Sequence, residues 1–209
     1  MTGQNHKENL KKTYNKIAED WNQDHLDDVW SVEAARKYGG MFKTGADILD
    51  IGCGSGLKSI SLIEIGLDIT GIDISSKMIG IAKKNVPKGK FEIMDMENIT
   101  LEKKYDGVFA QACLLHARKK DAPGVIKHWV TLLKNGGYLY IAVKESNKNI
   151  NEEIVKENDY GYEYERFFSF YSKEEIEKYM ADVKLKIIYS TITFSGKTNW
   201  VQVIGKRVI

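Results

Sequence analysis

The chain of 209 residues contains only two cysteines, Cys53 and Cys113, and only two prolines. Neither cysteine belongs to a Cys-x-x-Cys pair or a Cys/His cluster, which argues against a disulfide framework and against a zinc site. No apolar run approaches the roughly 18 residues that a membrane-spanning helix needs, and the N-terminus lacks the apolar segment of a secretion signal. We therefore expect a cytoplasmic protein without a metal site or a membrane partner.

The sequence also lacks an excess of charge of either sign. Lysine and arginine total 31 against 29 for aspartate and glutamate, which gives a net charge of +2. Proteins that bind nucleic acids typically carry a basic surface, so nucleic acid is a less favoured partner than a small molecule. The composition, 43% hydrophobic and 29% charged residues, is typical of a globular protein, and the length suits a single domain. The oligomeric state is not indicated.

Short apolar runs alternate with helical segments after residue 46. Runs at 48–51 and 67–73 are each followed by a helical pattern, and further strands are predicted near 91–93, at 105–110 and at 137–143. This β-α-β-α order predicts a doubly wound, mostly parallel sheet with helices on both faces. Two last apolar strands, 185–194 and 199–205, flank a short turn, which predicts an antiparallel C-terminal hairpin.

Helices are predicted where apolar residues recur every three or four positions. The segments 7–24 and 31–43 have this spacing before the first strand. Ser75 and Asp121 stand where a side chain caps the start of a helix, and Ser172 with Glu175 has the spacing of a capping box.

The strongest local signal is a buried strand that runs into a turn containing Gly52, Gly54 and Gly56. Glycines in such a turn let a ligand approach the backbone closely. A dinucleotide-binding turn has the order G-x-G-x-x-G, whereas here Leu57 stands where the third glycine of that pattern would be. This departure argues against an NAD-linked reductase.

An aspartate at the end of the next strand points to a nucleoside ligand. Asp73 follows Asp50 by 73 − 50 = 23 residues, close to the roughly 20 residues expected for an acid that binds ribose hydroxyls. The glycine turn, the strand-end acid and the β-α-β context together predict a ligand with a free ribose.

Four motifs resemble those of the class I S-adenosylmethionine-dependent methyltransferases, in particular small bacterial and archaeal members. They lie at 48–56, 71–75, 94–97 and, as a pair, 105–110 with 133–139, so the resemblance covers nearly the whole chain. It implies a Rossmann-like, doubly wound, seven-stranded sheet and S-adenosylmethionine as the cofactor. It also implies four parts within the single domain 1–209. These are an N-terminal helical lid at 1–44, a cofactor-binding core at 45–145, an excursion over the acceptor site at 146–182 and the C-terminal hairpin at 183–209.

The resemblance also assigns roles to individual residues. The glycine loop underlies the methionine part of the cofactor, Asp73 binds the ribose, and Asp95 with the backbone of Met96 binds the adenine edge. Ile74 and Met78 pack against adenine, although core packing explains Met78 equally well. The implied cofactor-binding residues are Tyr14, Asp50, Gly52, Cys53, Gly54, Gly56, Asp73, Ile74, Met78, Asp95, Met96, Gln111 and Ala112.

The N-terminal helix carries a second part of the resemblance. Tyr14, Ala18 and Trp21 resemble the Tyr-x-x-x-Ala-x-x-Tyr/Trp pattern of an N-terminal helix that closes over the cofactor in many small-molecule members. Helical periodicity places all three on one face. Tyr14 is the predicted cofactor contact, whereas Trp21 fits a helix docked on the core at least as well.

Methyl transfer from a sulfonium is an in-line displacement, and the protein mainly positions the acceptor. Where the acceptor must lose a proton, His116 is the candidate catalytic base, because it follows the fourth strand near the ligand-binding edge of the sheet. A structural role in that loop is the alternative. The Asn-Pro-Pro-Tyr type of motif that nucleic-acid amino-methyltransferases use is missing after this strand, as is a Pro-Cys nucleophile.

The segment 160–171 is rich in aromatic residues that either line an acceptor pocket or fill a core. The leading hypothesis is methyl transfer to a small-molecule acceptor whose identity the sequence does not give. A tRNA or rRNA methyltransferase is the second hypothesis, because the tail of the chain also faintly resembles enzymes that modify wobble uridine. The third is a non-catalytic protein that binds S-adenosylmethionine.

Overall fold

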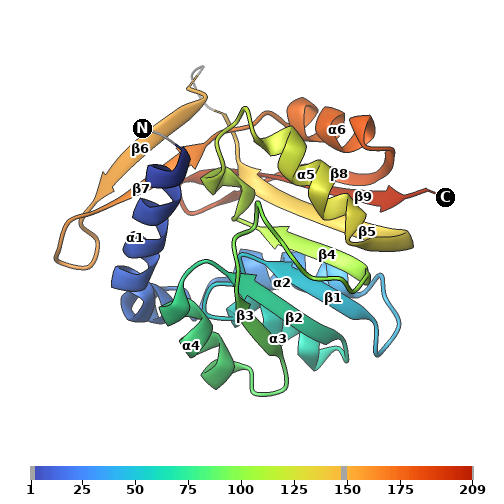
Figure 1. The fold of residues 1–209 in the computed structure, drawn as a ribbon, viewed down its shortest axis with the longest axis horizontal. Helices are drawn as coiled ribbons and strands as arrows, with labels where there is room; N and C mark the ends of the chain where they lie inside the picture. Colours follow the sequence, from blue (N-terminus) through green and yellow to red (C-terminus); the bar gives the residue numbers. More distant parts are fainter. Residues whose placement is uncertain (1–2, 147–149, 209) are drawn as a thin grey trace.

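The computed structural model describes residues 3–146 and 150–208, and its centre is a seven-stranded sheet (Figure 1). The strands of this sheet are β1 Asp47–Ile51, β2 Asp68–Asp73, β3 Lys90–Ile93, β4 Tyr105–Gln111, β5 Leu133–Lys144, β8 Leu185–Ser195 and β9 Thr198–Arg207. Their order across the sheet is β3-β2-β1-β4-β5-β9-β8. Strands β1 to β5 run parallel, and β9 lies antiparallel between β5 and β8. The predicted Rossmann-like sheet with an antiparallel C-terminal hairpin is confirmed.

The strand order reverses between β1 and β4. Strand β1 pairs in parallel with β2 on one side and with β4 on the other, so the chain moves outward to β3 before it returns. Ligands of open parallel sheets bind beyond the carboxyl ends of the strands at such a reversal. Gly52 follows β1 and Ala112 follows β4, so this topology brings two predicted site residues together.

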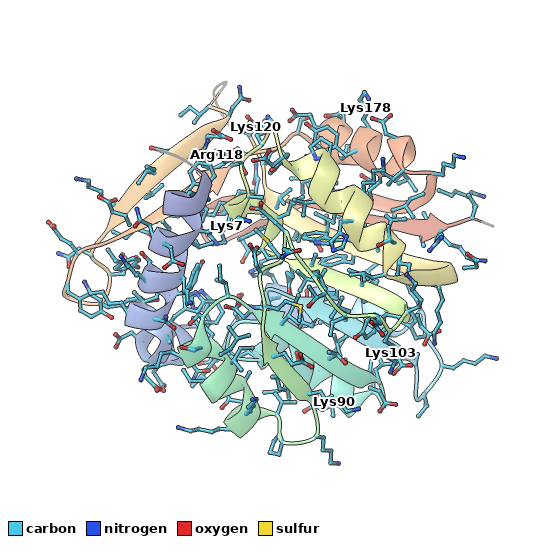
Figure 2. The ribbon with its side chains drawn as sticks, in the orientation of Figure 1. Lys7, Lys90, Lys103, Arg118, Lys120 and Lys178 are labelled. Atoms are coloured by element: carbon cyan, nitrogen blue, oxygen red, sulfur yellow. The ribbon has the colours of Figure 1, made fainter. Side chains whose placement is uncertain are left out.

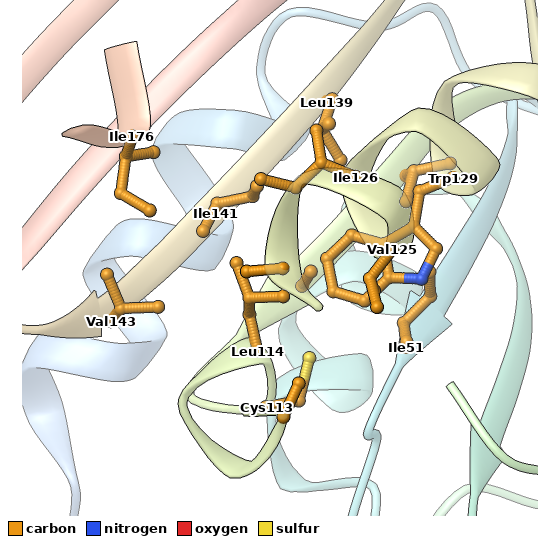
Figure 3. Packing of buried hydrophobic residues seen from close by; sticks show 14 of the residues in the cluster. Ile51, Cys113, Leu114, Val125, Ile126, Trp129, Leu139, Ile141, Val143 and Ile176 are labelled. Atoms are coloured by element: carbon orange, nitrogen blue, oxygen red, sulfur yellow. The ribbon is translucent and has the colours of Figure 1, made fainter. Parts of the chain in front are cut away.

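Helices cover both faces of the sheet (Figure 1). The helices are α1 Gly3–Asp24, α2 Val29–Gly39, α3 Leu57–Glu64, α4 Ser76–Asn85, the 3₁₀ turn η1 Leu114–His116, α5 Ala122–Thr131 and α6 Lys173–Asp182. On one face Trp129 of α5 and Ile176 of α6 pack in the largest core cluster, which Figure 3 shows. On the other face Ala35 of α2 and Leu62 of α3 pack in a second cluster. Within the described residues, no helix is both long and apolar enough to cross a membrane.

The polar excursion after β5 contains a two-stranded sheet of its own. Strands β6 Glu152–Glu157 and β7 Tyr164–Ser169 pair antiparallel, and Figure 1 shows them beside α1. The hydroxyl of Thr13 donates to the carbonyl of Glu165 at 2.9 Å, and the ammonium of Lys16 donates to the carbonyl of Glu163 at 2.7 Å. The excursion is therefore an ordered hairpin that is hydrogen-bonded to the N-terminal helix.

The helix ends confirm two of the three capping predictions. Ser75 accepts from the backbone N–H of Met78 at 3.1 Å, and Ser172 forms the full capping box with Glu175. Asp121 does occupy the predicted N-cap position of α5, but its side chain makes no capping hydrogen bond. Its backbone is already helical and its carbonyl accepts from Val125, so the turn is closed without the carboxylate.

Candidate functional site

The turn after β1 is a tight backbone cradle. Gly52 and Gly54 have φ values of +67° and +54°, in the left-handed region that glycine adopts at no steric cost. A Cβ on Gly52 would lie 2.3 Å from the Cβ of Cys113, so no larger residue fits there. The backbone N–H groups of Gly52 and Cys53 both donate to the carbonyl of Ile72, at 2.8 and 3.0 Å, which ties the loop to β2.

Asp73 lies at the end of β2, and its carboxylate is hydrogen-bonded to the backbone of the glycine loop. One carboxylate oxygen accepts from the N–H of Gly54 at 3.0 Å, and the other accepts from the N–H of Ser75 at 2.8 Å. Burial raises the pKa of Asp73 to about 6, although both hydrogen bonds act in the opposite direction. Each oxygen keeps a second lone pair, so the group can still accept from a ligand hydroxyl.

Most of the predicted cofactor residues line one cavity beside this loop. Its wall contains ten of them, namely Tyr14, Gly52, Gly54, Asp73, Ile74, Met78, Asp95, Met96, Gln111 and Ala112, and His116 as well. The other three lie outside the wall. Asp50 is buried and accepts from the Ser59 hydroxyl at 2.6 Å, Cys53 is buried, and Gly56 caps α3 with a φ of +81°. Asp50, Cys53 and Gly56 therefore support the glycine loop without lining the cavity. The cofactor-binding roles of the ten residues in the wall remain predictions.

The cavity suits a nucleoside in chemistry but is narrow. Apolar side chains such as Leu10, Met78 and Met94 alternate in its wall with the carboxylates of Asp73 and Asp95. Its volume is about 90 Å³, whereas ligand pockets usually offer about 300 Å³ or more. Four wall residues come from α1, so this helix covers one side of the cavity.

Lys7 holds α1 against the sheet edge, a contact that sequence reasoning missed. Its ammonium lies 2.7 Å from a carboxylate oxygen of Asp95 and 2.8 Å from one of Glu97. Figure 2 shows Lys7 on the side of α1 that faces the sheet. The predicted adenine-binding acid is therefore paired with the helix that closes the cavity.

A tyrosine–histidine pair joins the middle of α1 to the turn after β4. The Nδ1 of His116 is 2.8 Å from the carbonyl of Phe167, which can only accept, so Nδ1 carries the proton. The Nε2 therefore accepts from the Tyr14 hydroxyl, at 2.7 Å. Burial lowers the pKa of His116 to about 3, so the ring is neutral at physiological pH. The role of His116 as a base stays a prediction, and its only free lone pair is occupied by Tyr14.

A second, larger cavity of about 410 Å³ adjoins the first. The indole rings of Trp30 and Trp200 stack in its wall with centroids 4.5 Å apart. Lys144 and Arg166 also line it. The residues that line both cavities are Tyr14, Trp21, Lys58, Ala112 and His116.

The aromatic segment 160–171 serves as both core and pocket. Tyr171 and Phe168 are buried in the main core cluster, and Phe168 also faces the second cavity. Tyr160 and Tyr164 stack on each other with centroids 5.5 Å apart, near the turn of the hairpin. Some residues of this segment therefore belong to the core, and others face a cavity or pack on each other near the hairpin turn.

Three lysines of the two cavities, Lys7, Lys58 and Lys144, were not predicted as site residues. Lys144 was open to prediction, because it ends β5 at the same sheet edge as Asp73 ends β2. Lys7 and Lys58 reach the site through helix packing that no local pattern reveals. In the residues that the structure describes, no group of three His, Cys, Asp or Glu side chains could hold a metal ion.

Comparison with known proteins gives a match at the level of a family. Residues 48–137 match the model of a methyltransferase domain. A putative methyltransferase of Invertebrate iridescent virus 6 is 38% identical over 105 residues, covering 48% of this chain and 38% of the viral protein. The chain spans less than half the length of the curated relatives it matches.

Two solved structures share the whole architecture at low sequence identity. The 1,6-didemethyltoxoflavin-N1-methyltransferase of Burkholderia thailandensis has a TM-score of 0.80 at 15% identity and covers 100% of this chain and 92% of its own. The magnesium protoporphyrin IX methyltransferase of Synechocystis PCC 6803 has a TM-score of 0.77 at 20% identity, and the match covers 97% of this chain and 99% of the Synechocystis chain. Both were crystallised with S-adenosylhomocysteine. With the family match over residues 48–137, the strand order and the glycine loop, they show that this chain contains a methyltransferase domain and has the fold of the class I S-adenosylmethionine-dependent methyltransferases.

Proposed function

We propose that this chain transfers the methyl group of S-adenosylmethionine to a small-molecule acceptor. The cofactor occupies the cavity beside the glycine loop, and the acceptor occupies the larger adjoining cavity. The observation that carries this proposal is the shared wall of the two cavities, which includes Tyr14, Ala112 and His116. Ligands in the two cavities meet at this junction, as a displacement between two bound molecules requires.

The residues of the first cavity fit the cofactor by chemical type. Asp73 accepts hydrogen bonds from ribose hydroxyls, Asp95 binds the adenine edge, and Ile74 and Met78 supply apolar surface for the ring. S-adenosylmethionine supplies the electrophilic methyl group. The chain itself contributes orientation and exclusion of water, because α1 closes the cavity from outside.

His116 is poorly placed to remove a proton from the acceptor. Tyr14 occupies the one nitrogen of His116 that could accept a proton, since its hydroxyl donates to Nε2 while Nδ1 donates to the carbonyl of Phe167. The low pKa of His116 also makes the imidazolium costly. Acceptors that reach the site already deprotonated, or that lose their proton to water, need no base from the protein.

Two observations support a small acceptor. The second cavity, at about 410 Å³, is of the size that binds molecules of a few rings. The two structural neighbours are named as methyltransferases of 1,6-didemethyltoxoflavin and of magnesium protoporphyrin IX. Neither observation favours a tRNA or rRNA substrate.

Calorimetric titration with S-adenosylhomocysteine, with NADH as the control ligand, tests the cofactor assignment. We expect binding of S-adenosylhomocysteine alone, and binding of NADH alone would overturn the proposal. Labelled S-adenosylmethionine is then incubated with a pool of small metabolites and, separately, with tRNA at low salt. Label in the metabolites supports the proposal, label in tRNA replaces it with an RNA substrate, and label in neither with intact binding indicates a non-catalytic protein.

A further inference from the structure

Lys144 presents an unpaired cation to the second cavity. It lies at the carboxyl end of β5, and its ammonium sits 3.6 Å from the centroid of the Phe168 ring. That ring is the sole direct partner of the ammonium among residues 3–146 and 150–208, where neither an ion pair nor a hydrogen bond to it is found. A half-buried charge without a counter-ion is costly, so this position calls for an anion.

The neighbouring charges leave this wall of the cavity positive. The guanidinium of Arg166 donates two hydrogen bonds to Glu157, at 2.6 and 2.5 Å, so this pair is neutral as a unit. Glu157 and Glu153 also attract the ammonium of Lys144 electrostatically, but neither carboxylate forms an ion pair with it. Loss of water around it, and repulsion from Arg166, lower the pKa of Lys144 to about 8.

The acidic residues of the same cavity do not neutralise Lys144. Asp24 and Asp27 are exposed, and the side chain of Asp24 is 62% accessible to solvent. Asp28 acts electrostatically on Lys58, whose pKa is lowered by burial and partly restored by Asp28. The acids therefore lie at the solvent side or beside a different lysine.

Aromatic rings form the rest of the cavity wall. Trp21 from α1, Trp30 from α2, Phe168 from β7 and Trp200 from β9 reach it from four separate elements. Flat aromatic faces pack best against flat ligands, and the cation lies against one of these rings. The cavity thus combines planar apolar walls with one positive charge.

We propose that the acceptor is a small planar aromatic molecule that carries an anionic group, and that Lys144 binds this group. The proposal rests on the proposed function, because it takes the second cavity as the acceptor site. It adds a substrate class and a residue that determines specificity.

Three probe molecules separate the two parts of this proposal. 2-Naphthoate is planar and anionic, 2-naphthamide is planar and neutral, and cyclohexanecarboxylate is anionic without an aromatic plane. Their dissociation constants are measured by ligand-observed NMR titration of the full chain at pH 7, with and without saturating S-adenosylhomocysteine. We expect 2-naphthoate to bind about tenfold more tightly than either of the other probes.

Matched lysine variants test the role of Lys144. Lys144→Met keeps the length of the side chain and removes its charge, so the preference for 2-naphthoate over 2-naphthamide should disappear. Lys144→Arg should retain it. Lys37→Met is the control, because Lys37 also lies 3.6 Å over an aromatic ring, that of Tyr189, but on α2 outside this cavity. The control should behave as the natural chain does.

The outcomes distinguish this inference from the function on which it rests. Equal binding of 2-naphthoate and 2-naphthamide to the natural chain, with normal binding of S-adenosylhomocysteine, overturns the inference alone. A preference that survives in Lys144→Met removes Lys144 from the proposal. Failure of S-adenosylhomocysteine to bind overturns both. Unfolding of Lys144→Met would be seen as loss of S-adenosylhomocysteine binding, and the comparison of probes on the natural chain then decides.

Discussion

The two adjoining cavities differ in how their walls are assembled from the sequence. Apart from α1, the wall of the first cavity comes from the carboxyl ends of β1 to β4 and the segments that follow them, at 52–58, 73–78, 94–97 and 111–116. The second cavity adds Lys144 of β5, two residues of β7 and the C-terminal hairpin at 195–200 to residues 14–30, Lys58 and residues 112–116. A site built from adjacent turns can be read from local motifs, whereas a site built from distant segments becomes visible only in the fold.

The largest expected effect is at the glycine loop. Gly52→Ala should abolish measurable S-adenosylhomocysteine binding, a loss of about a hundredfold or more, because the new Cβ would overlap Cys113 at 2.3 Å and displace the loop. Calorimetry measures the affinity. Gly45→Ala is the matched control, since Gly45 also has a positive φ, +79°, but has no atom near its Cβ position. Equal losses in both variants would show that backbone strain alone is responsible.

The second effect concerns the strand-end acid. Asp73→Ala should weaken S-adenosylhomocysteine binding by about 1.5 to 3 kcal/mol, or ten- to a hundredfold, because a charged acceptor of hydrogen bonds is lost. Asp68→Ala is the control at the exposed start of the same strand. An unchanged affinity for Asp73→Ala would remove the ribose-binding role and leave Asp73 as a residue that only shapes the loop.

The third effect is a dependence on pH. With the pKa of Asp73 raised to about 6, a ligand that binds its ionised form should bind about tenfold more weakly at pH 5 than at pH 7. The pKa of an aspartate in an unfolded chain is about 3.9, so the folded chain binds the proton of Asp73 more tightly than the unfolded chain does. The contribution of Asp73 to the free energy of unfolding therefore falls as the pH rises from about 4 to 6. Asp50, also near 6, lies outside the cavity wall and should affect stability only. Calorimetry across this range, with Asp73→Asn as the variant that should lose the dependence, provides the test.

The smallest effect lies at the junction of the two cavities. Tyr14→Phe leaves the Nε2 of His116 without its donor, which should weaken S-adenosylhomocysteine binding about fivefold through displacement of α1. Tyr38→Phe is the control, because it removes a buried hydroxyl that donates to the carbonyls of Val108 and Tyr138, at 3.1 and 2.8 Å, in the other core cluster. Both variants should lose about 1 kcal/mol of stability in thermal unfolding. A loss of affinity in Tyr38→Phe as well would mean that the binding change reports general destabilisation.

The sequence predicted the part of the molecule in which local pattern and fold agree. The strands around Asp50 and Asp73 are apolar runs that fit a sheet buried on both faces, and the glycine turn has a spacing that few other structures need. Ser75 was recognised as a cap because its position relative to the helix is fixed by backbone geometry. These features depend on residues within a few positions of one another.

The rest could not be predicted because it depends on tertiary contacts. Strand β6, Glu152–Glu157, has mostly exposed side chains and four charged residues, so no apolar alternation marks it as a strand. It forms because β7 pairs with it and α1 packs against β7. The pairing of Lys7 with Asp95 and the orientation of Lys144 over Phe168 join residues far apart in the sequence. Such pairs leave no local pattern in the sequence.

Helix α1 contributes wall residues to both cavities and is hydrogen-bonded to the β6–β7 hairpin. We expect α1 to move outward when the cofactor enters, and the second cavity would then lose Tyr14 and Trp21 from its wall. With the acceptor placed in that cavity as proposed, it would bind only after α1 has closed again over the cofactor. Steady-state kinetics should accordingly show a compulsory order, with S-adenosylmethionine binding first, S-adenosylhomocysteine leaving last, and competitive inhibition between these two ligands alone.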